Sequence, residues 1–288
     1  MHSEALMTRQ VPAAPRGGSR GIRPSAHRMR TLQRHGWMSD QHGAWAMMAL
    51  PPLLGWALSG RLSWFVLLLL VAWAMAFQLF SATCLWVKTP AKRRARILPA
   101  LATYGVATAV PGVALLVSRP QLLWWGCAFA PLASCALFLV WQGRERSLAA
   151  RAASILAGSV MGPVAFSLAS ADGSPVAVSA HAWAACAIFA SYYVGTVPLV
   201  RSMIRGRRDP RWSLGATAYH AACTAATAIA WWFAVVSPWC VLAWVALTAR
   251  AWAMPALSRA RKRPLSPRLI GLTEMAWTCL LFATLLLP

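Results

Sequence analysis

The sequence predicts an all-α, polytopic membrane helix bundle with about nine transmembrane helices. Three observations carry this prediction. Hydrophobic residues make up 59% of the 288 residues, whereas only six residues are acidic. Apolar runs of about the 17–25 residues that cross a hydrocarbon core recur along the whole chain. The basic residues gather in every second connection between these runs, as the positive-inside rule describes.

Nine apolar runs can be marked in chain order. Each is expected to be a helix, because a backbone exposed to lipid must satisfy its own hydrogen bonds. Only Arg61 separates the first two runs, so we expect them to form a hairpin at one face. The runs are Ala44–Gly60, Leu62–Val87, Ile97–Val117, Leu122–Trp141, Ala149–Ser170, Val176–Val200, Leu214–Val236, Pro238–Leu257 and Leu269–Leu287.

The distribution of Lys and Arg predicts the orientation of the chain. All of these residues except Arg61 and Arg119 lie in the N-terminal tail, in the even-numbered connections or in the helix ends beside them. Cytoplasmic loops carry an excess of Lys and Arg. We therefore expect the N-terminus inside and the C-terminus outside, in the cytoplasmic (inner) membrane of a bacterium. Anionic lipid headgroups on the cytoplasmic side are the expected partners of these clusters.

The chain divides into a tail and one membrane domain. Residues 1–38 are rich in Arg, Pro, Gly and Ala, a composition that predicts a disordered basic tail. A start of translation at Met38 is an alternative, which would make this tail an artefact of the gene model. Residues 39–288 are expected to form a single transmembrane helical domain.

Several functional classes are disfavoured. The net charge of +22 does not indicate nucleic-acid binding, because the basic residues are dispersed between apolar runs. The seven cysteines lie inside apolar runs without a CxxC pair, so we expect packing roles rather than metal binding or disulfides. No metal and no other cofactor is predicted.

Polar residues within or beside the apolar runs are the candidates for function. Such groups are costly at membrane depth and are functional by default. In the predicted orientation most of them lie in the cytoplasmic half, which indicates a polar pocket open to the cytoplasm. The predicted lining residues are Gln41, His42, Glu145, Arg146, Tyr193, Arg201, His220, Arg250 and Glu274.

Within this set we assign roles by chemistry. Arg146 and Arg201 are expected to hold an anion, and His42, His220 and Glu274 are the candidates for proton transfer. His42, beside Gly43 at a helix start, is expected to point into the pocket. Glu274 needs a partner in lipid: Arg250 on the preceding run could reach it at a similar depth, or His220 could instead form a hydrogen bond with it. A purely structural ion pair remains the alternative for Glu274 and Arg250.

Five segments resemble the YwiC-like proteins, a family of bacterial integral membrane proteins. The resemblance covers nearly all of residues 39–287. It implies a polytopic membrane fold and carries no established activity. The segments are QHGAWAM at Gln41–Met47, RER at Arg144–Arg146, YYVGTVPLVRSMIR at Tyr192–Arg205, YH at Tyr219–His220 and IGLTE at Ile270–Glu274.

A weaker, architectural likeness is to the UbiA-type prenyltransferases. Those proteins have nine helices and hold Mg²⁺ and a prenyl diphosphate with two Asp-rich motifs in the second and sixth connections. Here these connections read KTPAKRRAR and RSMIRGRRDPRW, in which only Asp209 is acidic. A magnesium site needs several carboxylate or phosphate oxygens. The basic loops nevertheless suit a phosphorylated lipid held without a metal.

Together these observations predict a multi-pass membrane protein with a cytoplasm-facing pocket for an anionic or amphipathic small molecule. Whether such a protein is an enzyme stays open. The alternatives are a proton-coupled transporter and a structural membrane scaffold. Against a transporter, the outer half has few polar groups, whereas an alternating-access path must also cross that half.

Overall fold

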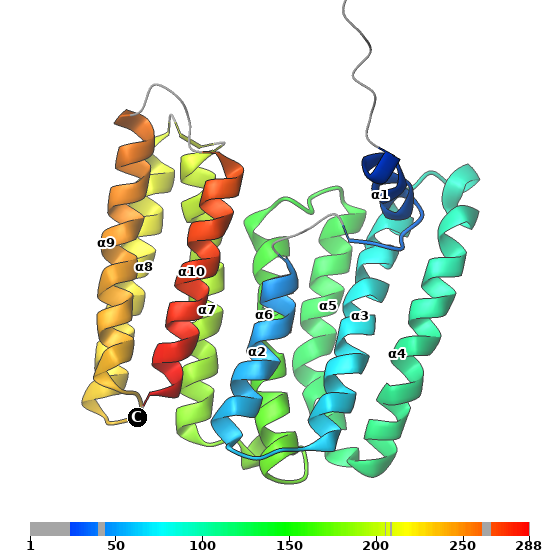
Figure 1. The fold of residues 1–288 in the computed structure, drawn as a ribbon, viewed down its shortest axis with the longest axis horizontal. Coiled ribbons are helices and arrows are strands. Elements are labelled where there is room, and N and C mark those ends of the chain that lie inside the picture. The colour runs from blue at the N-terminus through cyan, green and yellow to red at the C-terminus, as the bar shows by residue number, and fades with distance from the viewer. Residues whose placement is uncertain (1–23, 40–43, 205, 208, 261–265, 288) are drawn as a thin grey trace, which may run out of the picture.

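The computed structural model describes residues 24–39, 44–204, 206–207, 209–260 and 266–287. Within these ranges the ordered elements are α-helices and short 3-10 turns, with no strand (Figure 1). The α-helices are α1 (Pro24–Arg34), α2 (Ala44–Ser59), α3 (Trp64–Lys88), α4 (Leu98–Ser118), α5 (Gly126–Trp141), α6 (Leu148–Ser170), α7 (Ala180–Met203), α8 (Pro210–Trp232), α9 (Pro238–Ala260) and α10 (Pro267–Leu286). The 3-10 turns are η1 (Ala91–Ile97), η2 (Pro120–Trp125) and η3 (Pro175–Ala177).

Each predicted apolar run coincides with one of the helices α2–α10. Seven helical segments of the described chain are long and apolar enough to cross a membrane, and they contain α3, α4, α5, α6, α7, α9 and α10. The helix α2 is apolar but shorter, and α8 carries a tyrosine, a histidine and three threonines that lower its hydropathy. The multi-pass membrane character is therefore confirmed, whereas the count of nine spans stays a prediction.

The N-terminal segment differs from the predicted disordered tail in its second half. Residues 24–34 form α1, and the chain then turns at Gly36, whose φ is +81°. The Trp37 ring lies 5.9 Å from that of Tyr104, and the Trp37 carbonyl accepts a hydrogen bond of 2.8 Å from the Tyr104 hydroxyl. A composition-based prediction misses this contact because one aromatic anchor holds an otherwise polar segment against the bundle.

Successive helices from α2 to α10 run in alternating directions (Figure 1). The second, fourth, sixth and eighth connections between the apolar runs therefore lie at one end of the bundle. We call this the basic end; it contains α1, the α3–α4, α5–α6 and α7–α8 connections and the α9–α10 connection. The C-terminus, Arg61 and Arg119 belong to the opposite end. The structure thus places the basic clusters together, while the side of the membrane that they face stays a prediction.

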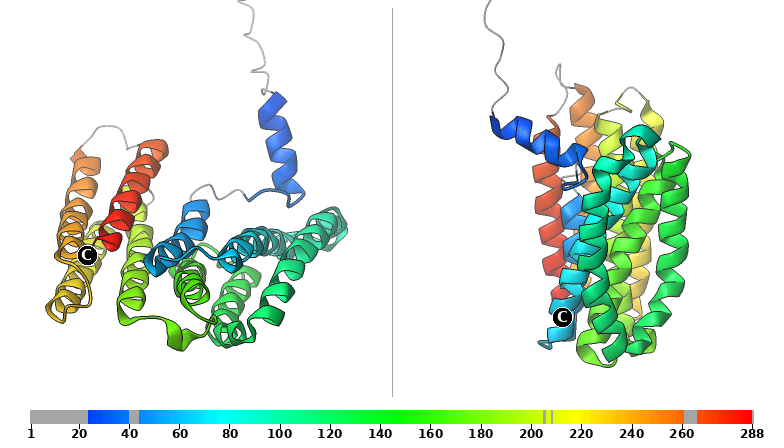
Figure 2. Two further views of the ribbon diagram at one scale, coloured as in Figure 1. Left: turned by 60° about the horizontal axis from the view of Figure 1, so that its bottom comes forward. Right: turned by 90° about the vertical axis from the view of Figure 1, so that its right-hand side faces the viewer.

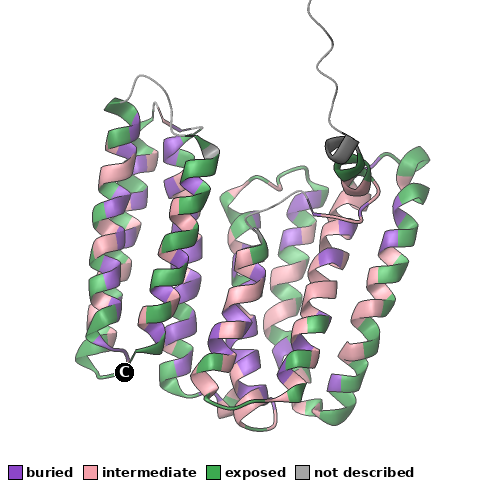
Figure 3. Ribbon diagram, in the orientation of Figure 1, coloured by how far each residue is buried: buried purple, intermediate pink, exposed green. Residues whose placement is uncertain are grey.

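The helices form a curved arrangement with α6 and α7 near its middle (Figures 1 and 2). The helix α7 contacts α6 and α2 as well as α8, α9 and α10, so it joins the two halves of the bundle. Buried residues are concentrated on α6 and α7, whereas α4 packs chiefly on α3 and is largely exposed (Figure 3). An exposed apolar helix is expected where lipid is the solvent.

The helices α2 and α6 cross at close range through their glycines. A Cβ placed on Gly55 would lie 1.9 Å from the backbone oxygen of Gly162, and a Cβ on Gly158 would lie 3.2 Å from the oxygen of Met47. Small residues at membrane helix interfaces let backbones approach in this way. The crossing fixes the start of α2 against the middle of the bundle, where the candidate site opens.

Candidate functional site

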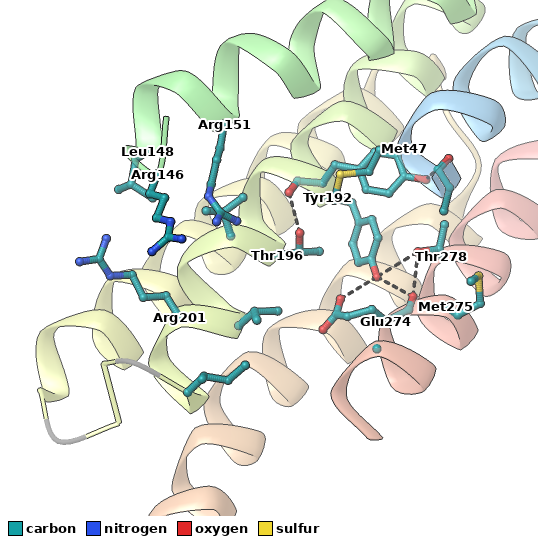
Figure 4. A pocket seen from close by; sticks show the side chains of 16 residues that line it. Met47, Arg146, Leu148, Arg151, Tyr192, Thr196, Arg201, Glu274, Met275 and Thr278 are labelled. Carbon is teal, nitrogen blue, oxygen red and sulfur yellow. Dashed lines mark hydrogen bonds between the residues drawn. The ribbon is translucent and has the colours of Figure 1, made fainter. Parts of the chain in front are cut away.

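A pocket of about 540 Å³ lies between α2, α6, α7 and α10 towards the basic end (Figure 4). This volume is within the range of about 300–1,000 Å³ that is typical of small-molecule sites. The lining residues are Ala46, Met47, Arg146, Leu148, Arg151, Tyr192, Tyr193, Thr196, Val197, Val200, Arg201, Ile204, Gly271, Glu274, Met275 and Thr278. The arginine side chains lie on one side of this pocket, and Glu274 lies with Tyr192 and Thr278 on the other (Figure 4).

Three arginines, which we call the arginine mouth, lie on one side: Arg146, Arg151 and Arg201 (Figure 4). They come from the α5–α6 connection, the first turn of α6 and the last turn of α7. All three are exposed, and none has a carboxylate partner among the described residues. The guanidinium of Arg201 stacks on the Trp212 ring at 3.8 Å, which fixes its position.

The start of α6 adds to the positive potential of the arginine mouth. Ser147 is the N-cap, and its hydroxyl accepts a hydrogen bond of 3.2 Å from the Ala150 amide. The N-terminal end of a helix carries a partial positive charge because its amides lack partners within the helix. The arginines and the helix end therefore favour the same kind of ligand group, an anion.

Polar side chains on the other side form what we call the deep wall: Tyr192, Tyr193, Thr196, Glu274 and Thr278. Tyr192 precedes Arg201 by nine residues on α7, which corresponds to roughly 13 Å along the helix axis. The Tyr192 hydroxyl lies 3.1 Å from Oε2 of Glu274 and 3.0 Å from its backbone oxygen. The Thr278 hydroxyl donates to that same backbone oxygen at 2.7 Å.

Arg250 lies behind the deep wall and forms an ion pair with Glu274. The Arg250 side chain is 4% exposed and that of Glu274 is 17% exposed, so the carboxylate faces the pocket and the guanidinium does not. Arg250 also contacts the sulfur of Met254 at 3.4 Å and lies 5.6 Å from the centre of the Trp277 ring. The predicted pairing of these two residues is confirmed.

The rest of the lining is apolar or internally bonded. Val197 and Val200 on α7, Ile204 just after it and Met275 on α10 contribute apolar lining. Tyr193 closes the side towards α2, where its hydroxyl donates to the Ala46 carbonyl at 3.3 Å. An aliphatic part of a ligand therefore has a surface to contact between the arginine mouth and the deep wall.

Four of the residues predicted from sequence line this pocket: Arg146, Tyr193, Arg201 and Glu274. Gln41 and His42, including the predicted direction of the His42 side chain, lie outside the described residues. The chain nevertheless reaches the pocket just after them, since Ala46 and Met47 are in its wall. That these residues bind a ligand stays a prediction.

Two predicted residues lie elsewhere. Glu145 forms an ion pair of 2.7 Å with Lys88, which ties the α5–α6 connection to the end of α3. His220 is fully buried, and its Nδ1 lies 2.7 Å from the Ala216 carbonyl of the same helix. It packs against Gly195 of α7, where an added Cβ would lie 3.0 Å from the His220 ring. His220 thus belongs to a packed helix interface.

Sequence reasoning misses several lining residues. Arg151 resembles the other topology charges in sequence, although its position one turn into α6 places it beside Arg146. Tyr192 is of a residue type common at the membrane interface but is fully buried. Thr196 and Thr278 carry no sequence signal, because threonines also occur in membrane helices to bond to backbone oxygens. Within the described ranges, no three His, Cys, Asp or Glu residues are close enough to hold a metal ion together.

Comparison with known proteins agrees with the resemblance seen in the sequence. The YwiC-like protein family matches residues 38–166. Over 249 residues the chain is 25% identical to the "Uncharacterized protein YwiC" of Bacillus subtilis (strain 168), an overlap of 86% of this chain and 95% of the relative. No solved structure matches the chain. The resemblance to the YwiC-like proteins is therefore confirmed.

Proposed function

We propose that this YwiC-like membrane protein binds an anionic, amphipathic small molecule in the pocket between α2, α6, α7 and α10. The observation that carries the proposal is the arginine mouth. Three guanidinium groups without carboxylate partners among the described residues converge on one pocket, beside a helix N-terminus. Guanidinium groups match carboxylate and phosphate oxygens in geometry as well as charge.

The ligand enters from the cytoplasm, in the cytoplasmic membrane of a bacterium. This orientation is supported by the gathering of the basic clusters at the end where the pocket lies. A phosphate group is held by arginine alone in this proposal, without a metal ion. In that respect the proposed site differs from the two Asp-rich motifs of the UbiA-type prenyltransferases.

Binding of decyl phosphate to the protein purified in maltoside detergent tests the proposal. We expect saturable binding that weakens at least about tenfold in Arg146→Gln/Arg201→Gln, because charge-assisted hydrogen bonds contribute about 1.5–3 kcal/mol each. The matched control is Arg93→Gln/Arg211→Gln, which removes the same charge from exposed sites of the basic end outside the pocket.

Inorganic phosphate, measured in parallel, separates two sources of the ligand. Weak binding of phosphate beside strong binding of decyl phosphate indicates an amphiphile, and equal binding indicates a soluble anion. If decyl phosphate binds both double variants as tightly as the parent, the arginine mouth is not the binding site. The basic charges then serve topology and headgroup contacts only.

A further inference from the structure

The two ends of the pocket differ in the hydrogen-bond donors and acceptors that they offer. The arginine mouth offers only donors, because a guanidinium has five N–H groups and no acceptor. The deep wall has hydroxyl groups and one carboxylate, which can both accept. A ligand that spans the pocket therefore meets different chemical requirements at its two ends.

The hydroxyl protons of the deep wall are already used within the protein. Tyr193 donates to Ala46, and Thr196 donates to the Tyr193 carbonyl at 2.7 Å. Tyr192 and Thr278 both donate to Glu274. Each hydroxyl carries a single proton but two lone pairs. These hydroxyl groups therefore have no free proton to offer, and because they are buried, the partly exposed carboxylate of Glu274 is the acceptor that a ligand can reach.

Glu274 provides acceptor capacity without net charge. Its two carboxylate oxygens offer about four lone-pair sites, of which Arg250 and Tyr192 occupy two. The charge of Glu274 is balanced by Arg250 behind it. A neutral donor group can bond to such a carboxylate, whereas a second anion would face unpaired acceptors.

From this asymmetry we infer that the ligand is an elongated amphiphile with an anionic group at one end and a neutral hydrogen-bond donor, such as a hydroxyl, at the other. The anion lies in the arginine mouth and the donor bonds to the Glu274 carboxylate, which its buried hydroxyl neighbours hold in place. The two positions are separated by roughly 13 Å along α7. This inference rests on the proposed function, because it assigns the far end of the same ligand.

Two probes that differ in one terminal group test the inference: ω-hydroxydecyl phosphate and its ω-methoxy analogue. The terminal oxygen of the second probe accepts but cannot donate. We expect the hydroxyl probe to bind the parent protein at least about tenfold more tightly than its analogue, as for a hydrogen bond to a charged group. Arg146→Gln/Arg201→Gln should weaken both probes by the same factor.

Variants of the deep wall localise the effect. In Arg250→Met/Glu274→Leu the hydroxyl advantage should disappear, and in the milder Thr278→Val it should fall. The matched control is Thr284→Val on the same helix, whose hydroxyl bonds to the Leu281 carbonyl outside the pocket. It should leave the advantage unchanged.

The outcomes separate the inference from the function on which it rests. If both probes bind the parent with equal affinity, the pocket binds an anionic amphiphile and the assignment of its far end is wrong. That assignment is equally wrong if the hydroxyl advantage survives unchanged in both deep-wall variants. If neither probe binds the parent, the proposed function fails, and the inference with it.

Discussion

Arg250 and Glu274 bring two opposite charges into the interior of a helix bundle with few other ionisable groups. Removing charges from water is expensive, and their attraction offsets this cost only when the geometry is good and the remaining polar atoms are bonded. Here Tyr192 supplies a further hydrogen bond to the carboxylate and the Trp277 ring lies near the guanidinium, although Nη1 of Arg250 is buried without a hydrogen-bond partner. The pair therefore behaves as one neutral unit at the back of the pocket.

Removing one charge of this ion pair should lower the stability of the protein more than removing both charges together. We expect Arg250→Met alone to destabilise the protein by about 3–5 kcal/mol, because Glu274 is then buried without a counter-ion. Arg250→Met/Glu274→Leu should recover most of this loss. Unfolding by sodium dodecyl sulfate in mixed micelles measures both. A single variant as stable as the double variant would show that Glu274 does not need its partner.

The sequence predicts how deep the polar residues lie in the bundle better than it predicts which neighbouring helix their side chains face. Counting from the span ends places Arg250 and Glu274 at one level, and their pairing follows from the cost of an isolated charge. The same counting places His220 at pocket depth, but rotation about the α8 axis turns it into the interface with Gly195. Hydrophobic periodicity cannot give this rotation where α8 is polar and apolar on several faces.

Among the elements, α2 and α6 are in close backbone contact through Gly55 and Gly162. We expect Gly55→Ala to destabilise the protein by about 1–3 kcal/mol, because the added methyl group meets a backbone oxygen that cannot move independently. Gly112→Ala is the control, since a Cβ there meets nothing within 4 Å. It should be neutral or slightly stabilising, as expected for alanine inside a helix.

Thermal unfolding in the same detergent compares the two glycine variants. Equal stability of Gly55→Ala and Gly112→Ala would mean that α2 and α6 do not cross as closely as described. The pocket wall at Ala46 and Met47 would then also need revision, because the crossing positions this end of α2.

The helical elements are predictable because lipid allows few alternatives. A lipid-exposed backbone must satisfy its own hydrogen bonds, and a helix does this within one apolar segment, so runs such as Leu62–Val87 coincide closely with α3 (Trp64–Lys88). The helix α1 is not predictable in this way, because its residues are polar and its anchor is a single tryptophan, Trp37. The hydropathy rule gives no information about polar segments outside the apolar runs.

For the whole molecule, the position of the basic end relative to the membrane is the main expectation. Arg93 and Arg61 lie at opposite ends of the bundle, and both are exposed. We expect Arg61→Cys to react with a membrane-impermeant maleimide in intact bacterial cells, and Arg93→Cys to react only after lysis. The reverse pattern would place the basic end, and the pocket with it, outside the cytoplasm.

The central claim is that the pocket holds a small molecule, and native mass spectrometry of the protein purified in mild detergent tests it most directly. We predict a co-purifying anionic species on the parent and on Arg93→Gln/Arg211→Gln. It should be absent from folded Arg146→Gln/Arg201→Gln. A parent protein without any bound species, which also fails to take up decyl phosphate, would contradict the claim and favour a structural role for the polar residues.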